Sequence, residues 1–552
     1  MLGDDAKPVA AAPDLAAADQ LYRAGKFAKA EASYRAALQA DPKLVPAQVG
    51  LVRAMLRQQR IDESLEAVNA ALAAQPDSAA LLAARGDVQF RRGDMSDAES
   101  SYLAAMNADP KEVHAYLRLA RLYVSSSLYR KAYDLQQSAH QIAPDDEDVR
   151  REWWWMLPWK ERLAPLEAYL SGPHPNEDTK WMEKYLEALK APVHACRLAG
   201  KVDQTETKLE TMHLGPHRIG GIGLPVTLNG RSARLLLDTG AGGILVSHSV
   251  AKRAGLVRIS SEHLPGIGDE GLRSGYTAVA DRIGIGELEF QDCVVHVING
   301  SPVNGEEGLI GADVFGSYLI DIDLPGMELK LSPLPKRPED TLVPKALNSE
   351  GEEQTAAEGN EGGPEEQGAK DHNAKAKLKP APRLPRNRYI APGMTDWTKV
   401  FHFANLILVP TMLNDSKPML FALDTGAIAN VLSVRAAQQV GKVSSQHHLS
   451  VRGVNGDVDK VYRSAATLQF GHLRQANTDI LTFDLSALSR QTGTEISGLL
   501  GFGMLRLLDV KLDYRDGLVD FAYDPKRVPA VGCDDRFPIA CPNPNSLQPF
   551  GP

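Results

Sequence analysis

A pattern of small and apolar residues recurs every 34 positions through the first 150 residues of the chain. Small residues let paired helices approach closely, and a proline begins the next unit because it cannot sit inside a helix. The pattern therefore predicts four repeats, each of two helices, over residues 15–150, with further helical periodicity in 158–190. The recurring positions are Pro42, Pro76, Pro110 and Pro144; Ala37, Ala71, Ala105 and Ala139; Ala30, Ser64, Ala98 and Ala132; and Gly25, Gln59, Gly93 and Ser127.

The second half of the chain contains apolar runs of strand length, two of which end at the same triplet. Residues 238–240 and 424–426 both read Asp-Thr-Gly, and small residues and another apolar run follow each triplet. A strand that ends in a tight glycine turn presents the carboxylate of Asp238 or Asp424 at its tip. Two facing carboxyls share a proton, so one acts as general base toward a water while the other acts as general acid.

The duplication extends beyond the triplets, because landmarks before and after each of them keep their order and approximate spacing. Two copies with matched surroundings argue against the alternative that each triplet is only a β-turn. The paired landmarks are 225–229 with 410–414, 266–268 with 453–456, 285–288 with 470–473, and 308–311 with 498–501.

On these residues the chain resembles the retropepsin-like and pepsin-like aspartic proteases over residues 213–335 and 396–526. The resemblance implies an all-β bilobal fold in which a flap closes over the substrate. We expect the two lobes to pair within one chain rather than each with a lobe of another chain, because the tether gives a high effective concentration. It implies catalytic roles for Asp238 and Asp424, and supporting roles for Thr239, Gly240, Thr425 and Gly426. The flap and substrate-binding residues that it implies are Gly266, Ile267, Gly268, Gly453, Val454 and Asn455.

Some positions depart from the family pattern. Gly242 and Ile428 stand where retroviral members usually carry a second aspartate, and Asp313 of the first half is matched by Gly503 in the second. We therefore expect a polar contact of Asp313 in one lobe only. These differences leave the carboxyl pair intact and bear on substrate specificity.

The 34-residue period resembles tetratricopeptide (TPR) repeats, which stack into a solenoid whose concave face binds proteins or extended peptides. The alternative is a solenoid that serves only as a spacer. The tryptophans at 153–155 follow the repeats, and we expect them to cap the solenoid or attach it to the next domain rather than to anchor a peptide.

The length of 552 residues predicts several domains, because one hydrophobic core does not grow to this size. We expect an N-terminal all-α TPR solenoid followed by the all-β bilobal fold. The expected divisions are 1–14, a flexible N-terminus; 15–150, the repeats; 151–204, a helical cap or linker; 205–335, the first protease lobe; 336–395, a disordered charged linker; 396–526, the second lobe; and 527–552, a C-terminal tail. Since every landmark lies outside the repeats, residues 205–535 are expected to cleave short peptides on their own.

The composition bears on which kinds of partner the protein binds and on where it is located. The net charge of −9 gives no basis for binding nucleic acid, and no apolar run is long enough to cross a membrane. The start of the chain does not read as a signal peptide. Cys533 and Cys541 are near enough to bridge, which favours a periplasmic or secreted protein whose signal has been removed; two free thiols in a cytoplasmic protein are the alternative. No metal-binding spacing occurs, and no cofactor is expected.

The leading hypothesis is an aspartic-type endopeptidase whose repeats recruit a polypeptide substrate or a partner. The alternative is a catalytically silent peptide-binding scaffold. Two intact triplets favour the enzyme, because a scaffold has no chemical need for either carboxylate.

Overall fold

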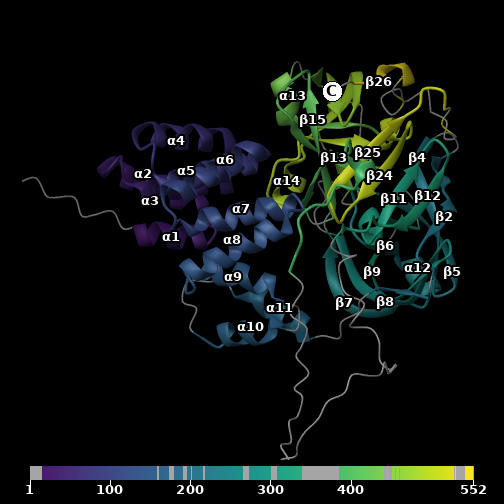
Figure 1. The fold of residues 1–552 in the computed structure, drawn as a ribbon, viewed down its shortest axis with the longest axis horizontal. Coiled ribbons are helices and arrows are strands. Elements are labelled where there is room, and N and C mark those ends of the chain that lie inside the picture. The colour runs from purple at the N-terminus through teal and green to yellow at the C-terminus, as the bar shows by residue number, and fades with distance from the viewer. Residues whose placement is uncertain are drawn as a thin grey trace, which may run out of the picture.

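The computed structural model has a helical N-terminal part and a β-rich C-terminal part (Figure 1). It describes residues 15–157, 161–172, 179–190, 196–200, 202–215, 218–264, 273–299, 307–338, 384–403, 405–440, 444–445, 451–453, 456–458, 460–527, 529, 541 and 543–550. The predicted order of a helical repeat region followed by an all-β bilobal region is confirmed. Within the described residues, no helix has the length and apolar character needed to cross a bilayer.

The repeat region consists of eight helices that pair as four antiparallel hairpins. The small residues of the 34-residue pattern, including Ala30, Ala98 and Ala105, are fully buried where two helices meet. The helices are α1 (Leu15–Arg23), α2 (Phe27–Ala40), α3 (Val45–Arg57), α4 (Ile61–Ala74), α5 (Ala79–Arg92), α6 (Met95–Ala108), α7 (Val113–Ser125) and α8 (Tyr129–Ile142).

Three further helices follow the repeats: α9 (Glu147–Met156), α10 (Leu163–Leu170) and α11 (Lys180–Lys190). Trp153 of α9 stacks on His140, and Trp154 packs edge-on against Tyr169 of α10. Two of the three adjacent tryptophans therefore attach the last helices to the end of the solenoid.

Lobe 1 is a nine-stranded sheet in the order β1-β9-β6-β10-β5-β4-β8-β7, with β3 paired to β4. Short β10 runs parallel to β5 and antiparallel to β6, so it fixes the end of β5 in the sheet. The strands are β1 (Arg197–Ala199), β3 (Glu210–Gly215), β4 (Arg218–Leu228), β5 (Arg231–Asp238), β6 (Ile244–Ser247), β7 (Val257–Leu264), β8 (Arg273–Ile285), β9 (Leu288–Ile298) and β10 (Gly308–Gly311); helix α12 (His248–Arg253) follows β6.

Lobe 2 repeats this plan in the order β14-β15-β16-β23-β17-β22-β21-β18, with β26 paired to β22. Here β23 runs parallel to β16, as β10 does to β5. The strands are β14 (Phe401–Phe403), β15 (Leu406–Leu413), β16 (Met419–Asp424), β17 (Val431–Ser433), β18 (Ser444–Ser445), β21 (Tyr462–Phe470), β22 (Leu473–Phe483), β23 (Gly498–Gly501) and β26 (Leu547–Pro549). The helices are α13 (Val434–Val440), α14 (Ser486–Thr492) and α15 (Phe502–Leu505).

A third sheet joins the two lobes. Its order is β13-β25-β24-β11-β12-β2, and β11 of lobe 1 pairs antiparallel with β24 of lobe 2. Alternating apolar side chains on these two strands are fully buried, for example Ile320 and Leu512. The strands are β2 (Thr205–Lys208), β11 (Tyr318–Asp323), β12 (Glu328–Pro333), β13 (Thr398–Lys399), β24 (Leu508–Asp513) and β25 (Leu518–Tyr523).

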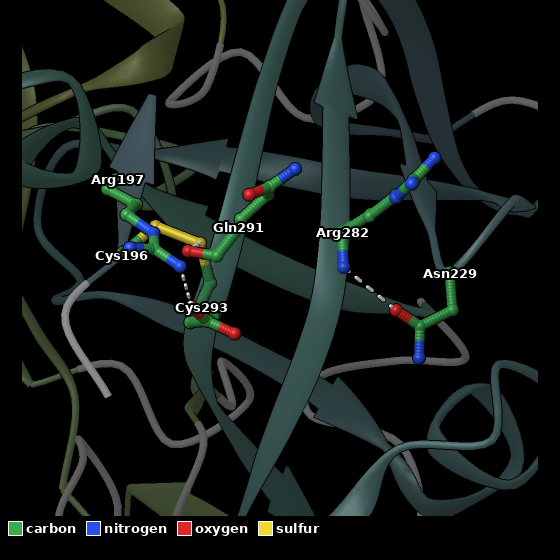
Figure 2. The surroundings of a disulfide bond; sticks show 7 residues. Cys196, Arg197, Asn229, Arg282, Gln291 and Cys293 are labelled. Atoms are coloured by element: carbon green, nitrogen blue, oxygen red, sulfur yellow. Dashed lines mark hydrogen bonds and ion pairs between the residues drawn. A yellow bond between two sulfur atoms is a disulfide. The ribbon is translucent and has the colours of Figure 1, made fainter. Parts of the chain in front are cut away.

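A disulfide between Cys196 and Cys293 ties the segment that enters lobe 1 to β9 (Figure 2). The two cysteines are 97 residues apart in the sequence, so the disulfide closes a long loop. This loop reduces the conformational freedom of the unfolded chain and thereby stabilises the fold. No pattern in the sequence indicates this pair. Cys541 is also disulfide-bonded, whereas Cys533 lies outside the described residues.

The repeats and lobe 2 share a hydrophobic core. Phe90 of α5 packs edge-on against Phe403 of β14 at 5.9 Å, and the cluster continues into Leu408 and Leu420 of lobe 2. Helix α14 and the residues after it lie against α5 and α7 (Figure 1). The repeats therefore bury part of lobe 2, which bears on the untested expectation that residues 205–535 act on their own.

Backbone groups reinforce this contact. The Thr494 hydroxyl donates to the Phe90 carbonyl at 2.7 Å, and the Glu495 N–H donates to the Arg91 carbonyl at 2.9 Å. The Arg91 guanidinium donates to the Ser489 carbonyl at 2.5 Å. These bonds link the end of α5 to α14 and to the segment between α14 and β23.

A carboxyl pair across the inter-lobe sheet makes stability depend on pH. Burial, followed by a hydrogen bond and repulsion from Asp509, raises the pKa of Asp321 from 3.8 to about 7. The folded protein thus keeps a proton that the unfolded chain loses near pH 3.8. This contribution to stability is fully present below that pH and is lost as pH rises through about 7.

We therefore expect Asp321→Asn to reduce the difference in melting temperature between about pH 5 and pH 8. The amide cannot ionise, so the repulsion with Asp509 at the higher pH disappears. Thermal unfolding at both pH values measures the effect, with the exposed Asp281→Asn as the matched control. An unchanged difference in the Asp321 variant would contradict the assignment.

Candidate active site

Asp238 and Asp424 occupy equivalent places at the ends of β5 and β16. Asp238 lies opposite Gly311 of parallel strand β10, and Asp424 lies opposite Gly501 of parallel strand β23. The apolar residues that precede each aspartate are buried, so the strand is anchored in the lobe and its tip points toward the other lobe.

The two carboxyl groups meet and are hydrogen-bonded to one another. Asp238 also accepts a hydrogen bond from the Gly240 N–H at 2.9 Å. Asp424 accepts two, from Gly426 at 3.0 Å and from Ala427 at 2.9 Å. The pair thus lies between two turns whose backbone N–H groups hold the carboxylate oxygens in place.

Each triplet glycine lies directly against the aspartate of the opposite lobe. A Cβ atom on Gly240 would come within 2.7 Å of the Asp424 carboxyl carbon, and one on Gly426 within 2.5 Å of the Asp238 carboxyl carbon. A side chain at either position would push the carboxyls apart. The third residue of each triplet must therefore be glycine for the pair to form.

The two threonines form a reciprocal network beneath the carboxyls. Each hydroxyl donates to the carbonyl that precedes the opposite aspartate: Thr239 to Leu423 at 2.8 Å, and Thr425 to Leu237 at 2.7 Å. Each hydroxyl also accepts from the backbone N–H of the other threonine at 3.0 Å. Since all these groups are buried, the network fixes the position of one loop relative to the other.

The electrostatics of Asp424 follow from its burial. Withdrawal from water raises the pKa of this carboxyl, while the N–H groups of Ala427 and Gly426 and the bond with Asp238 act in the opposite direction. A carboxyl with a raised pKa beside a second carboxyl is suited to hold the single proton that general acid–base chemistry requires.

The predicted flap residues are only partly described. Gly453 ends β19 (Val451–Gly453) and pairs with Gly456 of β20 (Gly456–Val458), so it lies in a small separate hairpin. Gly266, Ile267, Gly268, Val454 and Asn455 lie outside the described residues.

The polar contact expected of Asp313 is present. Its carboxylate accepts from the Gly243 N–H at 2.9 and 3.1 Å. In lobe 2 the position of Asp313 is occupied by Gly503, which has no side chain to accept such a bond and whose N–H donates to the Ile428 carbonyl at 3.0 Å.

Two residues near the site carried no signal in the sequence. Asn405, between β14 and β15, donates from its side-chain amide to the Gly240 carbonyl at 3.3 Å. Tyr514, just after β24, has a buried hydroxyl with no hydrogen-bond partner among the described residues. Burial and the nearby charges of Asp313 and Asp238 raise its pKa. Neither residue belongs to a duplicated landmark, so no motif could have identified it.

The threonine network makes a direct prediction. Thr425→Ala should destabilise the protein by about 1–3 kcal/mol for each buried group left without a partner, namely the Leu237 carbonyl and the Thr239 N–H. Thr425→Ser, which keeps the hydroxyl, should lose much less. Denaturant unfolding of the two variants measures the difference, and equal losses would show that the methyl group rather than the hydrogen bonds is responsible.

Comparison with known proteins agrees with this geometry. A family model described as aspartyl protease matches residues 224–314 and 409–503, which contain both triplets. A tetratricopeptide-repeat model matches residues 21–88. No curated protein matches the chain.

Solved structures similar to the chain include a thermophilic TPR protein of Thermus thermophilus, at 20% identity and a TM-score of 0.28, over 32% of this chain and 97% of that one. Another is MamA of Desulfovibrio magneticus RS-1, at 16% and 0.20, over 24% and 75%. A third is the first TPR domain of human RPAP3, at 16% and 0.18, over 24% and 94%. The family models therefore identify tetratricopeptide repeats in the first part of the chain and an aspartyl protease segment in each of the two lobes.

Proposed function

We propose that the chain is an aspartic endopeptidase in which Asp238 and Asp424 are the catalytic residues. The observation that carries the proposal is the hydrogen-bonded carboxyl pair at the junction of the lobes, held by reciprocal threonine bonds. Bringing the buried carboxyl of Asp424 against the partly buried carboxyl of Asp238 is costly, and a peptide-binding scaffold would gain nothing from it.

The chemistry follows from one proton shared by two carboxyls. The ionised carboxylate removes a proton from a water placed between them, and the water oxygen attacks the peptide carbonyl carbon. The protonated carboxyl gives its proton to the carbonyl oxygen, which yields a neutral tetrahedral diol. The diol then collapses: the carboxyl that took the proton from water gives it to the nitrogen as the C–N bond breaks, and the other carboxylate takes a proton from a diol hydroxyl, so the pair again holds one proton in its starting arrangement.

The Gly240 and Gly426 turns would keep both carboxyls in place through this cycle. Their N–H groups donate to oxygens that are charged for part of the cycle. Donors that are already oriented require no rearrangement when the charge moves, which lowers the barrier.

The repeats would recruit a polypeptide substrate or a protein partner. The support is the TPR match, because such solenoids commonly bind proteins through their concave face. Because the third and fourth repeats pack on lobe 2, a recruited chain would be held close to that lobe.

Incubation of the full chain with an unfolded protein and a peptide library, followed by mass mapping of cuts, tests the proposal. We expect internal cuts between about pH 3 and pH 8 that pepstatin suppresses. A folded, pure protein that makes no cuts at any pH in this range would instead support the catalytically silent scaffold.

A further inference from the structure

A pocket of 280 Å³ lies where helix α7 of the repeats meets lobe 2. Arg121 and Val124 line it from α7, His402 and Asn405 from the start of lobe 2, and Gln491 from α14. Neither the repeats nor the lobe forms this pocket alone. A volume of this size holds one large side chain with part of its backbone.

The pocket adjoins the active-site loop. Asn405, which lines it, donates its side-chain hydrogen bond to the Gly240 carbonyl at 3.3 Å. Gly240 itself lies against the Asp424 carboxyl. A polypeptide lying across the carboxyl pair could therefore extend past Asn405 and into the pocket within a few residues, since an extended chain advances about 3.3 Å per residue.

The charge of the pocket is positive. The lining residues include neither aspartate nor glutamate, and the two carboxylates that act electrostatically on Arg121, Glu152 and Asp87, lie outside the pocket lining. The Arg121 guanidinium donates to the Thr492 carbonyl at 3.1 Å and lies over the Phe90 ring at 5.3 Å. The other N–H groups of the planar Arg121 guanidinium remain as donors, and their fixed geometry favours binding of a carboxylate.

The remaining walls add neutral hydrogen-bonding groups and apolar surface. Burial, with a smaller effect from Arg388, lowers the pKa of His402 to about 4, so this ring is neutral near pH 7. Its Nε2 atom is buried without a hydrogen-bond partner among the described residues. Asn405 and Gln491 supply amides, while Val124 and Phe403 supply apolar contact. This combination suits a carboxylate carried on a short aliphatic stem.

We propose that this composite pocket binds a carboxylate group of the polypeptide substrate, at a position beyond the residues next to the cut, with Arg121 as its partner. The inference rests on the proposed protease function and extends it. The repeats then form part of the substrate site, and helix α7, which lies outside the protease lobes, contributes to substrate specificity.

The test uses the full-length protein and a peptide that it is found to cleave. Glu and Gln are placed in turn at each position up to about six residues on either side of the cut, with the C-terminus as free acid or amide. We expect kcat/KM to rise about tenfold for Glu at one distal position, or for the free acid, as a charge-assisted hydrogen bond allows. The two arms distinguish a side chain from a chain terminus.

Arg121→Gln should abolish this preference, and Arg121→Lys should retain part of it. Arg121→Glu should transfer the preference to a lysine at the same position. The matched control is Arg23→Gln, an exposed arginine of α1 in the same solenoid. Melting temperatures of all variants show that the fold is kept.

Cleavage without any acidic preference, or a preference that Arg121→Gln leaves unchanged, would overturn the inference while leaving the protease function intact. If wild type makes no cuts, the protease proposal fails, and fluorescence anisotropy with the same Glu and Gln peptides tests the pocket separately. Equal binding of both peptides, or equal binding by wild type and Arg121→Gln, then rejects it.

Discussion

Replacing either Asp238 or Asp424 with asparagine should reduce kcat/KM on a mapped peptide by at least about 1000-fold. The amide can neither take a proton from water nor share one with its neighbour, so the general acid–base cycle stops. Asparagine keeps the shape and an oxygen that accepts the N–H of Gly240 or Gly426, so melting temperatures should remain close to wild type. Kinetics and thermal unfolding of the two variants measure both effects.

Asp313→Asn is the matched control for this experiment. This carboxyl lies in lobe 1 and accepts from the Gly243 N–H, but it is not one of the hydrogen-bonded pair. We expect its kcat/KM to stay within about tenfold of wild type, since an amide oxygen also accepts this bond. If Asp238→Asn or Asp424→Asn supported turnover near the wild-type rate, the assignment of the pair would be wrong.

Removal of residues 1–156 should unfold lobe 2. Loss of the repeats exposes side chains such as Phe403, Leu408 and Leu420, which pack with the repeats in one cluster. Each costs about 1.5–3 kcal/mol when exposed, so several together approach the roughly 5–15 kcal/mol that typically stabilises a folded domain. Hydrogen exchange of lobe 2, together with solubility and circular dichroism, measures the result.

A shorter deletion of residues 1–42 is the control, because it removes α1 and α2. Among the described residues, the hydrogen bonds and ion pairs between the repeats and lobe 2 begin at Asp62 of α4 and continue through α5 and α7. This deletion should therefore leave exchange in lobe 2 unchanged. If deletion of residues 1–156 also left hydrogen exchange in lobe 2 unchanged, the shared core would contribute little to the stability of lobe 2.

The sequence predicted the parts of the structure that leave a repeated local pattern. The 34-residue spacing yields the helices because each repeat meets its neighbour in the same way, and the two triplets mark Asp238 and Asp424 because both lobes use the same turn. The predicted roles of the flap residues remain predictions, since most of them lie outside the described residues.

Contacts between distant parts of the chain left no such pattern. Phe90 and Phe403 are in contact although they are far apart in the sequence. In the sequence, neither phenylalanine can be distinguished from an ordinary core residue. The same holds for Cys196 and Cys293, whose pairing depends on β1 lying beside β9. Asn405 reaches the active-site loop from a connection between two strands, so its role depends on tertiary structure alone.

The sheet that joins the lobes has a consequence for the targets of the proposed protease. Because β11 and β24 are paired along their length and the threonine bonds fix the two loops, the lobes are not free to swing apart and admit a folded domain. We therefore expect the proposed site to accept an extended segment of a target rather than a folded domain. Susceptibility of a native target should then follow how often its scissile segment unfolds locally, so the target's own opening equilibrium, rather than its sequence alone, would set the rate at which it is cut.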